Sequence, residues 1–179
     1  MQRHAMIDLE TLSTRLDAAV ISIGIAIFDE NGIVETKGWG IDLNKVTGHI
    51  DPQTVAWWMK PDKDGAREFS FTGKFDPFTV AFELKSLLAA HNVQEVWAND
   101  PHFDYIILRS WWERTNGNGN IGEFPIPYWA PRSYKTLLGE AKRLGHDTSS
   151  WRGVFVAHDP IEDAASQARV VIECRKVLK

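Results

Sequence analysis

The stretch Ala19–Phe28 (AVISIGIAIF) decides the fold class of this chain. It is a nearly continuous apolar run, which is typical of a central β-strand covered on both faces. The turn Asp29–Gly32 (DENG) follows at once, and its Asn-Gly pair supplies the positive φ values that a tight hairpin needs. Residues Ile33–Ile41 are therefore predicted to return as an antiparallel strand beside it.

The stretch Ala5–Thr11 (AMIDLET) predicts a further strand of this meander. Residues two apart in a strand point to the same face, so Asp8 and Glu10 project together. Neighbouring carboxylates repel each other and lose hydration when buried, and a divalent cation such as Mg²⁺ or Mn²⁺ relieves both costs. The alternative is an edge strand whose acidic side chains face water.

Helices and strands alternate in the rest of the chain. Short helices are expected after Asp51 and over Pro77–Ala90, and the polar segment Asp62–Asp76 is expected to be an exposed connection. Val93–Ala98 follows a helix and is predicted to pair parallel to the first strand, with Ile126–Ala130 as a fifth, edge strand. The pattern indicates an α/β fold in one domain over residues 1–179, with a mixed five-stranded sheet flanked by helices.

Two predicted helix starts carry acidic side chains. Asp104 follows the fourth strand, at the strand end where α/β sheets bind ligands, although it would also stabilise the helix dipole. The second start lies in Ala157–Ala168 (AHDPIEDAASQA), where Asp159 is a good N-cap, Pro160 suits the first turn and Glu162 would complete a capping box. His158 and Asp163 flank this cap, and both are expected to project into a cleft at the helix start.

Composition excludes several classes of protein. A net charge of −4 argues against a protein that binds a long stretch of nucleic acid. It does not argue against an enzyme that binds a few nucleotides through bound cations. The single cysteine, Cys174, allows no internal disulfide and fits a cytoplasmic protein. The chain has no apolar signal core or membrane span, so no membrane partner is expected. The paired Trp57 and Trp58 are open to two interpretations, packing or stacking on bases.

Three acidic motifs follow one another along the chain: Asp8-Leu9-Glu10, Phe103-Asp104 and His158 to Asp163. This order resembles the DEDDh 3′-5′ exonucleases, the DnaQ-like group with a ribonuclease H-like fold. The segment Ile50–Met59 is similar to the corresponding part of a phage and bacterial, exoribonuclease-like subgroup. The resemblance implies a metal-dependent enzyme that hydrolyses phosphodiester bonds at the 3′ end of DNA or RNA, single-stranded by expectation, and releases nucleoside 5′-monophosphates.

The resemblance also implies roles for individual residues. Two divalent cations, Mg²⁺ or Mn²⁺, would be held by four carboxylates: Asp8, Glu10, Asp104 and Asp163. Neutral His158 would act as general base towards the attacking water. Thr11, Leu12 and Phe103 would hold the 3′-terminal nucleotide, while a plain core position stays open for Phe103. Dimers occur among similar exonucleases, so the resemblance leaves a homodimer open, and the sequence does not fix the oligomeric state.

Two other functions compete with this hypothesis. One is a non-catalytic module that binds nucleic acid with the same fold, and the other is a phosphodiesterase for short oligonucleotides. A binding module has no need for a neutral histidine beside the carboxylates, and the residues at all five motif positions are intact. The residues therefore favour hydrolysis.

Overall fold

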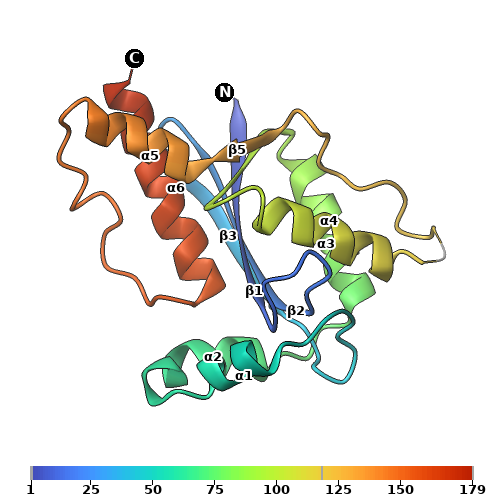
Figure 1. Ribbon diagram of the computed structural model, residues 1–179. Helices are drawn as coiled ribbons and strands as arrows, with labels where there is room; N and C mark the ends of the chain where they lie inside the picture. The colour runs from blue at the N-terminus through green and yellow to red at the C-terminus, as the bar shows by residue number, and fades with distance from the viewer. Residues whose placement is uncertain (1, 118, 179) are drawn as a thin grey trace.

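A single mixed sheet forms the centre of the computed structural model, which describes residues 2–117 and 119–178 (Figure 1). Its strands within these residues are β1 (Arg3–Thr11), β2 (Val20–Asp29), β3 (Gly32–Gly40), β4 (Val93–Ala98) and β5 (Pro131–Ser133). Their order across the sheet is β3-β2-β1-β4-β5. β1, β2 and β3 pair antiparallel, whereas β4 pairs parallel to β1 and to β5. The predicted meander and the parallel fourth strand are confirmed.

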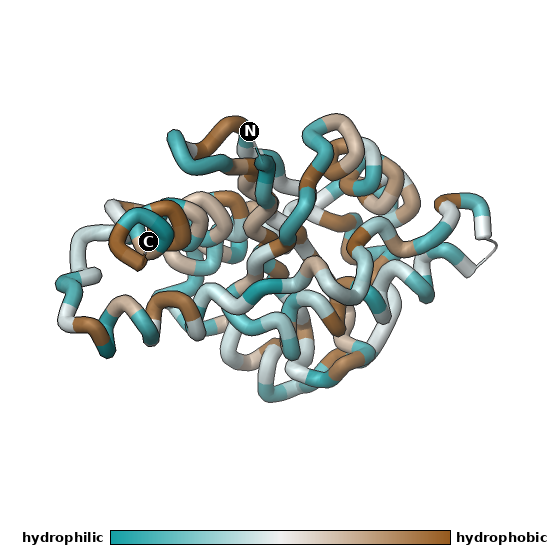
Figure 2. Tube along the Cα trace, turned by 90° about the horizontal axis from the view of Figure 1, so that it is seen from above, coloured by the Kyte–Doolittle hydropathy of each residue, from teal (hydrophilic) through white to brown (hydrophobic). Residues whose placement is uncertain are grey.

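Helices cover both faces of the sheet. They are α1 (Pro52–Trp58), the short 3₁₀ helix η1 (Pro61–Lys63), α2 (Asp64–Phe71), α3 (Pro77–Ala90), α4 (Asp104–Thr115), α5 (Tyr134–Arg143) and α6 (Pro160–Val177). α5 and α6 lie on one face and α3 and α4 on the other, while α1 and α2 lie across one end (Figure 1). Figure 2 shows the same two helix groups from above, on either side of the strands.

β2 explains this layering, because all of its residues are buried. Ile25 belongs to a core cluster that contains Leu84 of α3, while Ala26 and Phe28 belong to a second cluster that contains Val171 of α6. Successive residues of a strand point to opposite faces, so a continuous apolar run requires cover on both sides. The prediction from this stretch is confirmed.

Gly24 sets how closely α6 approaches the sheet. A Cβ atom at this position would lie 2.0 Å from the backbone oxygen of Pro160, the first residue of α6. The strand and the helix start are therefore in backbone contact, which only glycine permits. This contact places the first turn of α6 beside β1 and β2, and so positions Asp163.

The prediction of an exposed connection over Asp62–Asp76 is wrong. This segment contains η1 and α2, and α2 packs on the sheet through Ala66 and Ser70. The Ser70 hydroxyl is 2.7 Å from the hydroxyl of Ser22 on β2, so the two share a buried hydrogen bond. The buried side of α2 consists of small residues, and the charged residues around them hide its amphipathic pattern.

One boundary also differs from the prediction. The edge strand is Pro131–Ser133 rather than Ile126–Ala130, because the Ala130 N–H closes a turn on the Pro127 carbonyl (3.0 Å). α4 begins at Asp104, since a turn over residues 100–103 precedes it. Within the described part of the chain, no helix combines the length and the apolar character needed to cross a membrane.

Candidate active site

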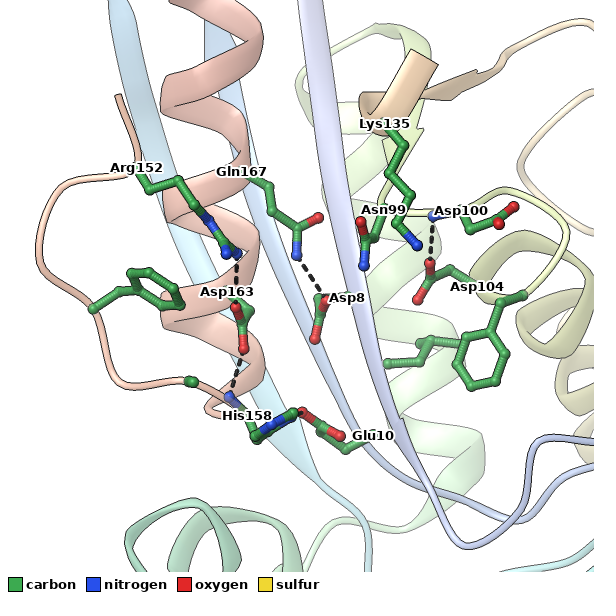
Figure 3. A pocket seen from close by; sticks show the side chains of 14 residues that line it. Asp8, Glu10, Asn99, Asp100, Asp104, Lys135, Arg152, His158, Asp163 and Gln167 are labelled. Carbon is green, nitrogen blue, oxygen red and sulfur yellow. Dashed lines mark hydrogen bonds and ion pairs between the residues drawn. The ribbon is translucent and has the colours of Figure 1, made fainter. Parts of the chain in front are cut away.

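A cleft of about 590 Å³ opens where β1, α4 and α6 meet (Figure 3). Asp8 and Glu10 reach it from the last residues of β1, Asp104 from the first residue of α4, and Asp163 from the first turn of α6. The parallel pairing of β4 with β1 ends at Ala98, so the chain enters α4 beside these two carboxylates. The structure thus brings together the four acidic residues that the sequence singled out, with His158 at the lower end of the cleft in Figure 3.

The electrostatics of this cleft disfavour four negative charges. Burial raises the pKa of Asp8 and of Glu10 well above their ordinary values, and the neighbouring carboxylates add to the effect. Burial also raises the pKa of Asp104 to about 7 and raises that of Asp163. Carboxylates gathered in this way are costly unless protons or cations compensate them.

Fixed hydrogen bonds orient the carboxylates of Asp8 and Asp104. The side-chain amide of Gln167 on α6 donates to Asp8 Oδ1 (3.0 Å). The backbone N–H of Asp100 donates to Asp104 Oδ2 (3.3 Å). Each carboxylate keeps oxygen lone pairs for another partner, since one such bond uses a single acceptor position.

Asp163 is held from two sides. The backbone N–H of His158 donates to its Oδ2 (2.6 Å), and the guanidinium of Arg152 lies 3.3 Å from its Oδ1. Donor atoms of Glu10, His158 and Asp163 all lie within 4.8 Å of one another. This spacing is small enough for a single cation to contact more than one of them.

His158 has an unusual backbone conformation, with φ of +67°. Left-handed φ values in non-glycine residues are uncommon and often mark functional sites. The ring Nδ1 lies 3.7 Å from Glu10 Oε1, and the ring packs edge-on against Trp57 with centroids 4.9 Å apart. Burial lowers the pKa of His158, and the positive charge of Lys63 lowers it further, which favours the neutral ring.

The helix cap beside His158 is partly as predicted. Asp159 accepts hydrogen bonds from the backbone N–H groups of Ile161 and Glu162, and Pro160 occupies the first turn. The reciprocal half of the capping box is wrong, because the Asp159 N–H donates to the Val156 carbonyl (3.2 Å) instead. The cap fixes the helix start through Asp159 alone.

The three predicted nucleotide contacts have different positions. Phe103 is half-buried, lines the cleft and packs on the core, so both interpretations describe part of its surface. Thr11 is buried and its hydroxyl donates to the Ser13 carbonyl (2.7 Å), and Leu12 belongs to the core around Trp58. Neither is among the described residues that line the cleft, whereas Leu9 is.

The paired tryptophans also differ in environment. Trp58 is buried and its indole N–H donates to the Thr11 carbonyl (3.0 Å), so it is a core residue that fixes the end of β1. Trp57 contacts His158. Two basic residues lie nearby: Arg132 on β5 pairs with Glu95, and Lys135 on α5 lines the cleft.

Sequence reasoning gave no separate role to four residues that line the cleft: Asn99, Arg152, Phe155 and Gln167. A signal for Gln167 existed, because it lies four residues after Asp163 and thus on the same face of a helix. Arg152 and Phe155 belong to the irregular segment between α5 and α6, where no periodic pattern predicts which side chains point inwards.

Solved structures share this fold at low sequence identity. The chain matches the nuclease domain of 3′hExo, a DEDDh family member bound to rAMP, with a TM-score of 0.59 and 12% identity over 98% of this chain and 92% of that one. It matches exonuclease X in complex with 5′ overhanging duplex DNA with a TM-score of 0.52 and 15% identity over 99% and 92% of the two chains. The fold is that of the ribonuclease H-like DEDDh 3′-5′ exonucleases.

Sequence comparison defines the family more closely. Residues 3–175 match the model of the 3′-5′ exoribonuclease Rv2179c-like domain, and the chain belongs to this family. It is also 28% identical to the exodeoxyribonuclease of Enterobacteria phage T4 over 191 aligned positions, which cover 89% of this chain and 83% of that protein. The protein is therefore a 3′-5′ exonuclease, as the motifs predicted.

Proposed function

We propose that this exonuclease hydrolyses the 3′-terminal phosphodiester bond with two divalent cations, Mg²⁺ or Mn²⁺, and with neutral His158 as general base. The products would be a nucleoside 5′-monophosphate and a strand shortened by one residue. One observation carries the proposal: four carboxylates with raised pKa values gather around one cleft that has His158 at its rim.

The residues present fit a pair of hard cations. Asp8, Glu10 and Asp104 offer oxygen donors, which Mg²⁺ and Mn²⁺ prefer, and Asp163 adds a fourth carboxylate. Their raised pKa values indicate uncompensated negative charge, which bound cations would neutralise. When bound, such cations activate the attacking water and stabilise the leaving 3′-oxygen.

His158 supplies the proton acceptor in this proposal. A base must be neutral to accept a proton, and burial lowers the pKa of His158. Edge-on packing against Trp57 and the hydrogen bond from its backbone N–H to Asp163 hold the residue at the cleft. Nδ1 lies near Glu10, so the base faces the same space as the carboxylates.

The proposed substrate is the 3′ end of a single nucleic-acid strand. The relatives named above include an exodeoxyribonuclease and structures bound to rAMP and to DNA. Leu9 and Phe103 line the cleft and would contact the terminal nucleotide. Contacts by Thr11 and Leu12, and a homodimer, stay predictions, and light scattering of the purified protein tests the homodimer.

A degradation assay tests the proposal. Strands of DNA and RNA that carry a 5′ label are incubated with the protein and Mg²⁺, in single- and double-stranded form, with and without chelator. We expect a metal-dependent ladder that shortens from the 3′ end and a mononucleotide product that co-migrates with a 5′-monophosphate. Asp104→Asn should abolish the ladder, while Asp100→Asn, at another cleft carboxylate, should leave most of it.

Other outcomes would support the competing functions. If the protein binds the strands but does not shorten them in the presence of metal, it is a binding module. Hydrolysis confined to strands of a few nucleotides would identify a phosphodiesterase for short oligonucleotides. Shortening that persists in chelator would contradict the two-cation mechanism.

A further inference from the structure

Arg152 lines the proposed catalytic cleft and contacts one of its carboxylates. Its guanidinium lies 3.3 Å from Asp163 Oδ1 and 4.3 Å from the centroid of the Phe155 ring (Figure 3). Among the described residues that line the cleft, Arg152 and Lys135 are the two with permanent positive charges. They lie on opposite sides of Asp8, Arg152 beside α6 and Lys135 on the side of Asp104.

The pairing with Asp163 does not satisfy Arg152. Its Nε atom is buried and has no hydrogen-bond partner within the described residues. Arginine recognises planar anions with two parallel N–H donors, whereas the contact to Asp163 uses only Nη2. The guanidinium is therefore suited to an anion that accepts from two of its nitrogens.

Asp163 has two competing partners in the proposed mechanism. Its Oδ2 accepts the short hydrogen bond from the His158 N–H (2.6 Å), and its Oδ1 accepts the longer one from Arg152 (3.3 Å), so Oδ1 is the oxygen that is more readily freed for a cation. A divalent cation bound at this carboxylate would repel a guanidinium that lies 3.3 Å from the same oxygen. Cation binding and the Arg152–Asp163 contact therefore oppose each other.

The path of the substrate places a phosphate near the displaced guanidinium. Phe103, beside Asp104, would contact the terminal nucleotide, and the scissile phosphate must lie over the carboxylates. The rest of the strand would then lie on the side of Asp8 where Figure 3 shows Arg152. The phosphate that follows the scissile one in the 5′ direction would then be the anion closest to Arg152.

We propose that Arg152 alternates between two partners: Asp163 in the cation-free protein, and the backbone phosphate immediately 5′ of the scissile phosphate in the substrate complex. The inference rests on the function proposed above. Phe155 keeps the plane of the guanidinium at the cleft in both states, because stacking on its ring does not depend on the anion.

Two measurements on Arg152→Gln test this proposal. In the absence of substrate, calorimetric titration with Mn²⁺ should show cation binding that is about 3- to 10-fold tighter than in the wild type, because a competing positive charge is lost. In the degradation assay, KM for a single strand should rise roughly 10- to 100-fold, with a much smaller change in kcat. A loss of loop structure would instead weaken the binding of both cation and strand.

Three controls test the charge of Arg152, the shape of its guanidinium and the position of the phosphate that it contacts. Arg143→Gln removes the same charge from an exposed pair with Glu140 on α5, and should change neither quantity. Arg152→Lys keeps the charge, so its Mn²⁺ affinity should stay near that of the wild type while KM still rises. A neutral methylphosphonate at the second linkage from the 3′ end should raise KM for the wild type and add nothing for Arg152→Gln.

The outcomes distinguish this inference from the proposed function. Mn²⁺ affinity that is unchanged or weaker in Arg152→Gln would overturn the competition with Asp163. A further rise in KM of Arg152→Gln on the methylphosphonate strand would overturn the phosphate contact. Failure of the wild type to shorten any strand would refute the proposed function, while the Mn²⁺ titration would still measure the contact between Arg152 and Asp163.

Discussion

Asp104 shows what the cleft costs when no cation compensates its charge. Its side chain is 4% exposed, and burial raises its pKa to about 7. A carboxyl whose pKa is higher in the folded than in the unfolded protein takes up a proton on folding between these two values. Its contribution to stability is therefore present at low pH and is lost as the pH rises from about 4 to about 7.

Replacement by asparagine removes this titration. In chelator, Asp104→Asn should gain stability relative to the wild type as the pH rises from 5 to 8, by about 1 to 4 kcal/mol. The amide oxygen can still accept the Asp100 N–H, so the change is confined to charge. Urea unfolding at four pH values measures the free energy of unfolding of both proteins. If this free energy changes with pH in the same way in both, the pKa of Asp104 is not raised by folding.

His158 can be tested without disturbing its backbone. Asparagine tolerates left-handed φ values better than most residues, so His158→Asn should keep the backbone N–H that binds Asp163. We expect kcat to fall about 100- to 10,000-fold, as for the loss of a general base, with Mn²⁺ affinity changed less than about threefold. Calorimetric titration and single-turnover rates give the two values. A large loss of Mn²⁺ affinity would make His158 a cation ligand instead.

At the scale of elements, the contact between β2 and α6 controls the site. Gly24→Ala would place a methyl group 2.0 Å from the Pro160 oxygen, so the start of α6 must move. We expect a loss of about 1 to 3 kcal/mol in the free energy of unfolding, as for other overpacked positions, together with weaker Mn²⁺ binding because Asp163 moves with the helix.

A matched glycine serves as the control for this variant. Gly139 lies within α5 and a Cβ atom there meets nothing within 4 Å, so Gly139→Ala should leave Mn²⁺ binding unchanged and stabilise the protein by about 0.5 to 1 kcal/mol. Wild-type Mn²⁺ affinity in Gly24→Ala would show that the position of α6 is not what holds Asp163 in place.

Helices and strands could be predicted from the sequence where their hydrophobic pattern matches how they pack in the fold. The apolar run of β2 and the cap at Asp159 could be predicted from the sequence, because each is a local signal. α2 could not, since its buried side chains are small and its packing depends on Ser22, which is 48 positions away from Ser70. Long-range contacts of this kind leave no periodic trace.

The candidate site shows the same difference between local signals, which the sequence carries, and long-range contacts, which it does not. The four carboxylates and His158 were found because they stand in motifs with a fixed order, and the structure brings them to one cleft. Arg152 lies in a loop, and its contact with Asp163 depends on how residues between α5 and α6 fold back on the helix start. Only coordinates reveal such a contact.

At the scale of the whole molecule, a net charge of −4 limits how the protein attracts nucleic acid. Lys135 and Arg152 are the permanent cations among the described residues of the cleft, so few phosphates are neutralised directly. At constant Mg²⁺, we expect the association constant for a single strand to fall as the salt concentration rises. A plot of the logarithm of this constant against the logarithm of the salt concentration should have a slope of about −1.4, which corresponds to two phosphate contacts. Arg152→Gln should reduce this slope by about 0.7, and a wild-type slope steeper than about −4 would indicate an extended binding footprint instead.

In the proposed mechanism, the carboxylates from β1, α4 and α6 together hold two divalent cations. Calorimetric titration of the wild type with Mn²⁺, in parallel with Asp8→Asn and Asp163→Asn, tests it most directly. We predict two Mn²⁺ ions bound per chain, and a loss of at least one of them in each variant. Binding of fewer than two ions to the wild type, or full binding in either variant, would refute the two-cation site.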